Sequence, residues 1–260
     1  MGKFLVAVSS KGGVGKSTLS YQVLTALLFH KHSKKHKLIE IDDNNQTDSF
    51  VSSIFEPTSF KVERGINEAL KELFNVFDDE NVVLDVGGGN DSLKTIDALN
   101  SMGVDENIVY FIPVLKNKHG MKNLLDTYNR IREKSNSTIV IVLNQTISSD
   151  KQVIENQFTY FFGNNELNID GVYKKVFNDE NLIVTSLTDT NVYDLAEDYN
   201  LTSYEIAQDE LNTAKFLKDE KDKGFDSFKK ALGFVNVYSK CVENYQDSFL
   251  GFYKDVKGIL

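Results

Sequence analysis

The stretch SSKGGVGKST, residues 9–18, decides the fold of this 260-residue chain. Within it, three glycines lie between two lysines, with one valine among them. A short apolar segment, residues 3–8, precedes the stretch, and an amphipathic segment, residues 16–31, overlaps its end. Strand, glycine-rich turn and helix in this order predict a phosphate-binding loop. Glycine lets the backbone N–H groups curl inward, and the amino end of a helix adds partial positive charge.

The residues of this loop have separate expected roles. Lys16 is expected to reach the β- and γ-phosphates of a nucleotide, and the hydroxyl of Ser17 is expected to bind Mg²⁺. The surrounding backbone would cradle the phosphates. The predicted nucleotide-binding residues of the loop are Gly12, Gly13, Val14, Gly15, Lys16, Ser17 and Thr18.

Composition limits the class of protein. The net charge of -9 argues against a general nucleic-acid coat, although it leaves room for a local basic patch. A single cysteine, Cys241, excludes a disulfide framework and a cysteine-based metal or cluster site within one chain. The first ten residues turn polar too soon for a signal peptide, and no run approaches the roughly 18 apolar residues of a membrane span. We therefore expect a cytoplasmic protein.

Short apolar segments alternate with amphipathic ones along most of the chain, which predicts βαβ units and a parallel sheet with helices on both faces. We expect a doubly wound α/β fold of the P-loop NTPase type, with residues 1–200 as the ATPase core. Residues 201–260, helical in pattern, are expected to pack on this core as added C-terminal helices of one domain. The predicted strands are 3–8, 37–42, 81–86, 107–114, 138–143 and 181–185, and the predicted helices of the core are 16–31, 65–77, 91–101, 117–134 and 150–161.

The loop departs from the common pattern G-x-x-x-x-G-K-[ST], because Ser10 stands at the first glycine position. Its pattern, K-G-G-x-G-K-[ST]-[ST], resembles the deviant Walker A motif of the ParA/MinD family of P-loop ATPases. The resemblance implies that ATP and Mg²⁺ bind and that two copies form a nucleotide-sandwich homodimer. It also implies that Lys11 contacts the phosphates held by the other subunit, whereas Lys16 acts within its own. A second cation at the γ-phosphate would stabilise transition-state charge, so hydrolysis would depend on dimerisation.

The segment EIDDNNQTD, residues 40–48, stands where the family has D-x-D-P-Q. Aligned on Gln46, Asp42 takes the place of the first aspartate and Asn44 that of the second, which the family uses to position the attacking water. An amide orients water but cannot accept its proton, although Asp43 is close enough to substitute. We therefore expect slow, partner-stimulated hydrolysis, with Lys11, Lys16 and Asp42 as the catalytic residues.

Two further segments extend the resemblance, which covers roughly residues 1–200 and is most specific in the first 18. Three apolar residues precede Asp85, as in a Walker B motif, so Ser17 and Asp85 are the predicted Mg²⁺ residues. The three glycines that follow, 87–89, resemble a switch loop. Asn144, at the end of the strand 138–143, stands where the family often places an asparagine near the adenine.

Local basic segments favour a DNA-partition ATPase within this family. Residues 29–37, FHKHSKKHK, contain four lysines, three histidines and no acid. For residues 29–37, and for the lysines between residues 215 and 230, the alternative is a charged surface that is simply exposed to solvent. We expect non-specific DNA binding by the dimer, a ParB-like adaptor as partner, and association with the nucleoid. The other two basic sets are Lys215, Lys218, Lys221, Lys223, Lys229 and Lys230, interleaved with acids, and Arg130, Arg132 and Lys134.

Three alternatives remain open from the sequence. The same chemistry would serve an accessory ATPase of conjugative DNA transfer. The last residues, SFLGFYKDVKGIL (248–260), have an apolar stripe that suggests either a MinD-like membrane helix or a last helix docked on the core. With one acid and two lysines it would bind anionic lipid poorly, so we expect no membrane partner. Asn44 leaves room for a nucleotide-dependent scaffold that hardly hydrolyses ATP.

Overall fold

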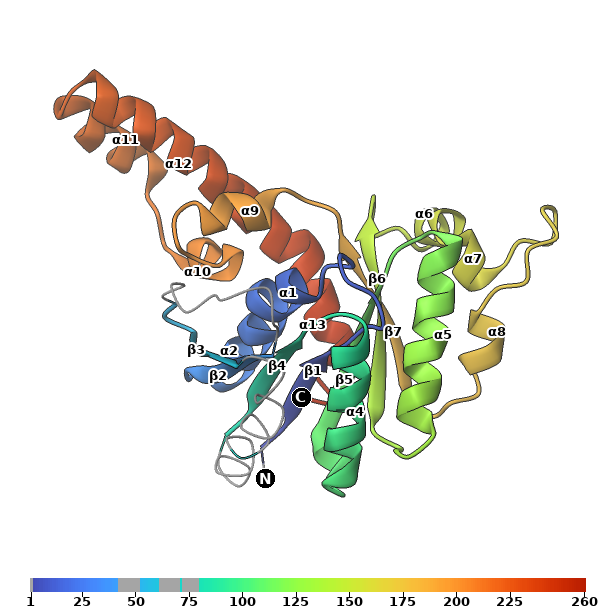
Figure 1. The fold of residues 1–260 in the computed structure, drawn as a ribbon. Coiled ribbons are helices and arrows are strands. Elements are labelled where there is room, and N and C mark those ends of the chain that lie inside the picture. Colours follow the sequence, from blue (N-terminus) through green and yellow to red (C-terminus); the bar gives the residue numbers. More distant parts are fainter. Residues whose placement is uncertain (1, 42–51, 61–70, 72–79) are drawn as a thin grey trace.

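The computed structural model describes residues 2–41, 52–60, 71 and 80–260. These residues form a seven-stranded sheet in the order β3-β2-β4-β1-β5-β6-β7, and every pair of neighbouring strands is parallel. Helices cover both faces of the sheet (Figure 1). The predicted α/β class is therefore confirmed. The strands are β1 Phe4–Ala7, β2 His36–Ile41, β3 Phe55–Phe60, β4 Val82–Val86, β5 Ile108–Val114, β6 Thr138–Thr146 and β7 Leu182–Thr188.

Successive residues of β1 point to opposite faces of the sheet, as the pleat of a strand requires. Phe4 and Val6 belong to one apolar core, and Leu5 and Ala7 belong to the other. The first core is covered by α4 Asn90–Ser101, α5 Lys118–Arg132, α6 Lys151–Gln157, α7 Thr159–Phe162 and α8 Tyr173–Val176. The second is covered by α1 Lys16–Thr18, the π-helical segment η1 Leu19–Leu24, α2 Thr25–His32, α9 Val192–Glu197, α10 Ser203–Gln208, α12 Phe225–Asn244, η3 Tyr245–Phe249 and α13 Leu250–Val256.

Strand β3 was not among the predicted strands. Its sequence, FEPTSF, contains a proline and three polar residues, so it has no continuous apolar run. In the sheet β3 pairs only with β2 and lies at the edge, where Pro57 can be tolerated without its N–H. Nearly all of the predicted helix 65–77 lies outside the described residues.

The last helices pack on the second core. Phe249, Phe252 and Val256 are at most 6% exposed, and the ring of Phe252 stacks on Phe111 of the inner strand β5. The apolar stripe of residues 248–260 thus packs against the sheet. Of the two alternatives for this segment, the structure has the last helix docked on the core. Among the helices of the described ranges, none is long and apolar enough to cross a membrane. The hairpin of α11 Thr213–Asp222 and the first half of α12 extends away from the sheet (Figure 1).

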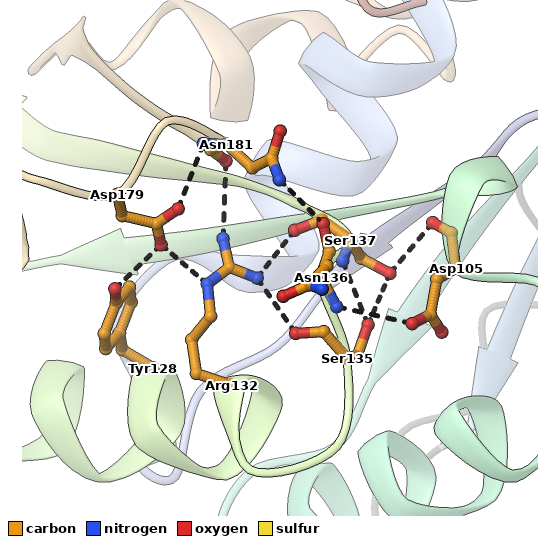
Figure 2. A network of polar contacts seen from close by, with 8 residues as sticks. All are labelled: Asp105, Tyr128, Arg132, Ser135, Asn136, Ser137, Asp179 and Asn181. Atoms are coloured by element: carbon orange, nitrogen blue, oxygen red, sulfur yellow. Dashed lines mark hydrogen bonds and ion pairs between the residues drawn. The ribbon is translucent and has the colours of Figure 1, made fainter.

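A polar network joins the end of α5 to the segments that precede β6 and β7 (Figure 2). Arg132 donates from Nε to Asp179 at 2.6 Å and from Nη1 to the carbonyl of Ser137 at 2.7 Å, and Tyr128 donates to the same Asp179 oxygen at 2.7 Å. Burial raises the pKa of Asp179, but the hydrogen bonds from Arg132 and Tyr128 outweigh it and hold this pKa below its usual value. The network ties three loops together at the amino-terminal edge of the sheet.

Ion pairs in this region argue against one of the basic sets of the sequence as a phosphate-binding surface. Arg132 pairs with Asp179, and Arg130 pairs with both Asp97 and Glu133. Lys134 lies 3.9 Å from Asp97. Because carboxylates compensate all three charges, these residues do not form a separate phosphate-binding patch.

Replacing Arg132 with alanine is expected to lower the free energy of unfolding by about 2–3 kcal/mol, because Asp179 loses its cation and the Ser137 carbonyl loses its donor. Arg130→Ala is the matched control. Its pair with Asp97 is about a third exposed and its pair with Glu133 more so, and a much smaller loss is therefore expected. Urea unfolding at pH 7.5 measures both variants, and equal losses would contradict the role assigned to Arg132.

His36, the first residue of β2, links the stability of the fold to pH. Its side chain is buried, and this burial lowers the pKa of His36 to about 4. That value includes the lowering effect of His32 and Lys34 and the raising effect of the backbone of Leu28 and Asn81. The neutral ring is therefore favoured in the folded state. Between pH 6.5 and 4 the unfolded chain binds more protons at this position, so this contribution to stability is lost as the pH falls.

Replacing His36 with leucine is expected to reduce this loss. Relative to pH 7.5, the wild-type protein at pH 5 should lose up to about 2 kcal/mol more stability than His36→Leu does, at about 1.4 kcal/mol per pKa unit. Asp85 acts in the opposite sense, because burial raises its pKa to about 6, but it does so in both proteins. Urea unfolding at the two pH values gives the difference, and parallel pH profiles would contradict it.

Candidate functional site

The ends of four parallel strands meet at the carboxyl edge of the sheet, where open α/β sheets bind their ligands. The phosphate loop follows β1, residues 87–89 follow β4, and further polar residues follow β6 and β7. A cavity of about 640 Å³ lies between the first two segments. It is lined by Gly12, Gly13, Gly15, Lys16, Ser17, Thr18, Val86, Gly88, Gly89 and Asp91.

The phosphate loop has the backbone that its glycines permit. Gly13 and Gly15 have φ values of 71° and 91°, in the left-handed region that favours glycine. A Cβ at Gly15 would lie 2.3 Å from Nδ2 of Asn144. Asn144 donates from this amide to the carbonyl of Val14 at 2.8 Å, and its Oδ1 accepts from the N–H of Gln145 at 3.0 Å. Asn144 therefore braces the loop through its Nδ2, while its Oδ1 is held by the backbone of the next residue.

Two serines anchor the beginning of the loop to neighbouring helices. The N–H of Ser9 donates to the hydroxyl of Ser92 on α4 at 3.2 Å. At Ser10 the N–H donates to the hydroxyl of Thr127 at 3.0 Å, and the side chain donates to the carbonyl of Asn123 at 3.1 Å, both on α5. Ser10, the residue that departs from the common motif, thus fastens the loop to α5 with a bond that glycine could not make.

The two lysines of the loop lie in different environments. Lys16 is 8% exposed, and its Nζ lies 3.4 Å from the carbonyl of Lys11, inside the curve of the loop. The side chain of Lys11 is exposed to solvent, and its backbone N–H is held by the Ser9 hydroxyl at 3.3 Å. One ammonium group is therefore positioned within this chain, and the other lies on the surface above the loop.

Asp85 is the penultimate residue of β4, lies beside the loop and is 3% exposed. Burial raises its pKa to about 6, against hydrogen bonds from Ser17 and Ser20 and the positive charge of Lys16. Ser20 lies in the π-helical segment η1 and donates to Oδ1 of Asp85 at 3.1 Å. The structure thus brings Ser17, Lys16 and Asp85 together, and it adds Ser20, which the sequence analysis did not single out.

Glu40 is a second carboxylate that the sequence analysis missed. It is 3% exposed, and it lies directly opposite Asp85 in the β2–β4 pair, so both side chains face the same side of the sheet. Its charge contributes to the raised pKa of Asp85, and its Oε2 accepts a hydrogen bond from Ser59 at 2.9 Å. The alignment on Gln46 gave Glu40 no role, and the pairing of β2 with β4 shows that it faces the same side of the sheet as Asp85.

The donors at this edge fit a magnesium ion. Mg²⁺ prefers oxygen ligands and retains water molecules, so it is held through one or two carboxylates and a hydroxyl. The hydroxyl of Ser17, the buried carboxylate of Asp85 and the neighbouring Glu40 supply this chemistry. A divalent cation would also relieve the repulsion between two buried carboxylates. The predicted catalytic residue Asp42, with Asp43 and Asn44, lies outside the described residues.

A smaller cavity of about 160 Å³ continues from the loop toward the ends of β6 and β7. It shares Gly15 and Thr18 with the phosphate cavity, and its volume suits a flat ring system. Asn144 lines it, and both ends of its amide bond to the main chain. The other residues around it are Gln145, Leu187, Thr188, Asp189, Thr190, Tyr193 and Asp194.

Gly88 provides a test of how the loop after β4 meets the phosphate loop. Replacing it with alanine is expected to destabilise the nucleotide-free protein by about 1–3 kcal/mol, the usual cost of overpacking. The new Cβ would lie 2.7 Å from the backbone nitrogen of Gly12 and 2.8 Å from its Cα. Gly12→Ala is the control, because a Cβ there meets no atom within 4 Å. Urea unfolding compares the two variants, and equal stabilities would contradict this contact.

Comparison with known proteins identifies the fold. No family model matches the sequence, and no curated protein matches it. Among solved structures, the ATP complex of a McdA variant of Cyanothece superposes with a TM-score of 0.51 at 15% identity, covering 89% of this chain and 96% of that one. A protein described as a plasmid partition protein of Borrelia burgdorferi B31, bound to AMPPNP, gives 0.50 at 15% identity, covering 92% and 99%. The predicted P-loop fold is confirmed, and at this identity the likeness concerns the fold.

Proposed function

We propose that this chain is an ATPase of the ParA/MinD type that dimerises around ATP and partitions DNA. One observation carries the proposal. A complete phosphate loop with a buried Lys16 and a neighbouring Asp85 also carries a second lysine, Lys11, whose side chain is exposed to solvent. The solved structures that share the fold include proteins bound to ATP and AMPPNP, which supports a nucleotide at this edge.

Within one subunit, the N–H groups of Gly12, Gly13 and Gly15 cradle the phosphates, and Lys16 neutralises their charge. The Ser17 hydroxyl and Asp85, aided by Glu40, hold Mg²⁺ and its water. When bound, the ion would supply positive charge that neutralises the phosphates. Ser20 orients Asp85 through its hydrogen bond, and Asn144 keeps the loop curved beside the cavity for the base.

The second subunit completes the site. Lys11 reaches across the dimer and places its ammonium group at the γ-phosphate, so hydrolysis occurs only in the dimer. Asp42 assists catalysis, and Asn44 orients the attacking water without accepting its proton. Turnover is therefore slow, and a ParB-like adaptor stimulates it.

The cellular role follows from the type of ATPase. The ATP-bound dimer binds DNA non-specifically, associates with the nucleoid in the cytoplasm, and is released when the adaptor stimulates hydrolysis. The shared fold of a plasmid partition protein supports this role, as does the basic segment 29–37. We further propose that residues 1–200 and 201–260 fold as one domain, since the apolar tail lies in the second core.

Sedimentation with long non-specific duplex DNA tests the proposal. The protein is compared with ATP, ADP and no nucleotide, at modest and raised salt. We expect the ATP state to bind most tightly and binding to weaken steeply with salt, because phosphate contacts release counterions. Absence of DNA binding in every state would reject the partition role. Nucleotide binding without turnover, with DNA present, would instead indicate a nucleotide-dependent scaffold.

A further inference from the structure

We propose that DNA binds at the amino-terminal edge of the sheet, on a surface built from the α2–β2 turn and the end of α13, so that each ATP dimer bridges two DNA segments. We call this surface the amino-edge patch. It consists of Lys34, Lys35, Lys254 and Lys257, supported by Lys31. The inference rests on the proposed function, and it assigns the DNA contact to residues that the sequence separates by more than 200 positions.

The first step is that two distant segments meet. Lys31, at the end of α2, donates from Nζ to the carbonyl of Lys257 at 3.4 Å and to that of Leu260. His30 packs its ring against Tyr253 of α13, with centroids 4.7 Å apart. The basic segment 29–37 and the lysines of the tail therefore form one surface.

The second step is that the lysines of this surface face solvent. On α13, Phe252 and Val256 are buried, and Asp255 accepts a hydrogen bond from Thr185 of β7 at 2.8 Å. By helix geometry, Lys254 and Lys257 lie on the opposite, outward side. All four lysines of the patch are exposed, and within the described ranges none has an ion-pair or hydrogen-bond partner for its ammonium group.

The third step concerns the local electrostatics. Burial lowers the pKa of His32, and the charged groups that lower it further are Lys31 and Lys34. For His36 the charged groups are His32 and Lys34. Four lysines and no acid lie within residues 29–37, so the turn itself carries positive charge although the whole chain has a net charge of -9. A concentration of positive charge of this kind suits a phosphate backbone.

The lysines of the α11–α12 hairpin are the competing surface. There, Lys223 pairs with Glu220 at 2.6 Å, and Ser227 also bonds to Glu220. Asp219, Asp222 and Asp226 lie among the remaining lysines. Because acids offset most of this charge, the hairpin is the poorer site for a polyanion.

The position of the patch decides how a dimer meets DNA. The α2–β2 turn precedes β2, so it lies at the edge of the sheet opposite the phosphate loop. Two copies that face each other through their phosphate loops must point these opposite edges away from one another. One dimer therefore presents two patches to two DNA segments. On long DNA both segments belong to one molecule, so the ATP state gains avidity that a single short duplex cannot provide.

The test compares two variants with equal charge changes. The patch variant is Lys34→Ala/Lys35→Ala/Lys254→Ala/Lys257→Ala, which retains Lys31 because that side chain holds the tail. The hairpin variant is Lys215→Ala/Lys218→Ala/Lys229→Ala/Lys230→Ala. Binding to long DNA and to a 12-base-pair duplex (about one helical turn) is measured against salt, with and without ATP. Nucleotide affinity is measured for each protein as a check on folding and on the phosphate site.

We expect the patch variant to bind long DNA at least 10-fold more weakly and to show a shallower salt dependence, by about 0.9 in log–log slope per lost phosphate contact. The hairpin variant should bind nearly as the wild type does, and ATP should strengthen binding to long DNA but not to the short duplex. A hairpin variant that loses DNA binding while the patch variant retains it would overturn the inference and leave the proposed function intact.

Two other results have different meanings. A wild-type protein that fails to bind DNA in any state would reject the DNA role itself, and with it this inference. Vesicles of phosphatidylglycerol provide the second arm of the test. If the patch variant loses binding to these vesicles and keeps its affinity for DNA, the patch contacts a membrane surface and the inference is wrong.

Discussion

Replacement of Lys11 with alanine is expected to lower ATP turnover by at least 100-fold and to leave nucleotide affinity within about threefold, since a trans-acting cation contributes roughly 10³–10⁵ to such reactions. Among the residues that the structure describes, none makes a hydrogen bond or ion pair with the exposed side chain of Lys11. The backbone of Lys11 supplies the structural bonds, through its N–H to Ser9 and its carbonyl to Lys16. Alanine retains that backbone, so the nucleotide should still bind.

Steady-state phosphate release and equilibrium binding of a fluorescent ATP analogue measure the two quantities. Lys116→Ala is the control, because Lys116 is also exposed and follows β5 at the same edge of the sheet. In the wild type, turnover per molecule should rise with protein concentration as dimers form. Normal turnover in Lys11→Ala would refute the role in trans, and turnover independent of concentration would place the whole site within one subunit.

Replacement of Lys16 with alanine is expected to weaken nucleotide binding at least 100-fold, a loss of about 2.7 kcal/mol or more. Lys16 is the buried cation of the loop, and its ammonium group lies on the Lys11 carbonyl where the phosphates would enter. Without it, the glycine N–H groups face the phosphate charge with no counter-charge in the same cavity. Lys16→Ala is thus expected to lower nucleotide affinity, whereas Lys11→Ala is expected to lower ATP turnover.

Calorimetric titration with Mg-ATP measures the affinity of Lys16→Ala, and thermal unfolding without nucleotide checks its fold. Added nucleotide should raise the melting temperature of the wild type and of Lys11→Ala but not that of Lys16→Ala, because a ligand stabilises only the state that binds it. Nucleotide affinity like that of the wild type would contradict the phosphate-loop assignment, and with it the proposed ATPase.

The phosphate loop and the class of fold could be predicted from contiguous residues. Strand, glycines, lysine and helix follow one another within about 30 positions, so their local preferences and spacing suffice. Strand β3 was missed because its own residues give no clear local signal for a strand. With Pro57 and few apolar residues it has little strand preference of its own, and pairing with β2 at the sheet edge makes it a strand.

Contacts between distant segments needed the tertiary structure. Nothing in the sequence indicated a role for Glu40, and the pairing of β2 with β4 places it opposite Asp85. In the sequence Ser10 is only a departure from the common motif, whereas in the structure its hydrogen bonds fasten the loop to α5. From the sequence, the basic set around Arg132 could bind phosphate. In the structure its charges are paired with Asp179 and Asp97.

The sequence by itself determined that a phosphate loop lies between a buried strand and a helix, that the sheet is parallel, and that two lysines share the loop. These properties depend on near neighbours, whose spacing is covalently set. The tertiary structure decided which carboxylates face each other, that the apolar tail is docked and that the lysines of residues 31–35 and 254–257 lie together. Such contacts depend on how strands pair and helices cross, and burial over the whole chain selects that arrangement.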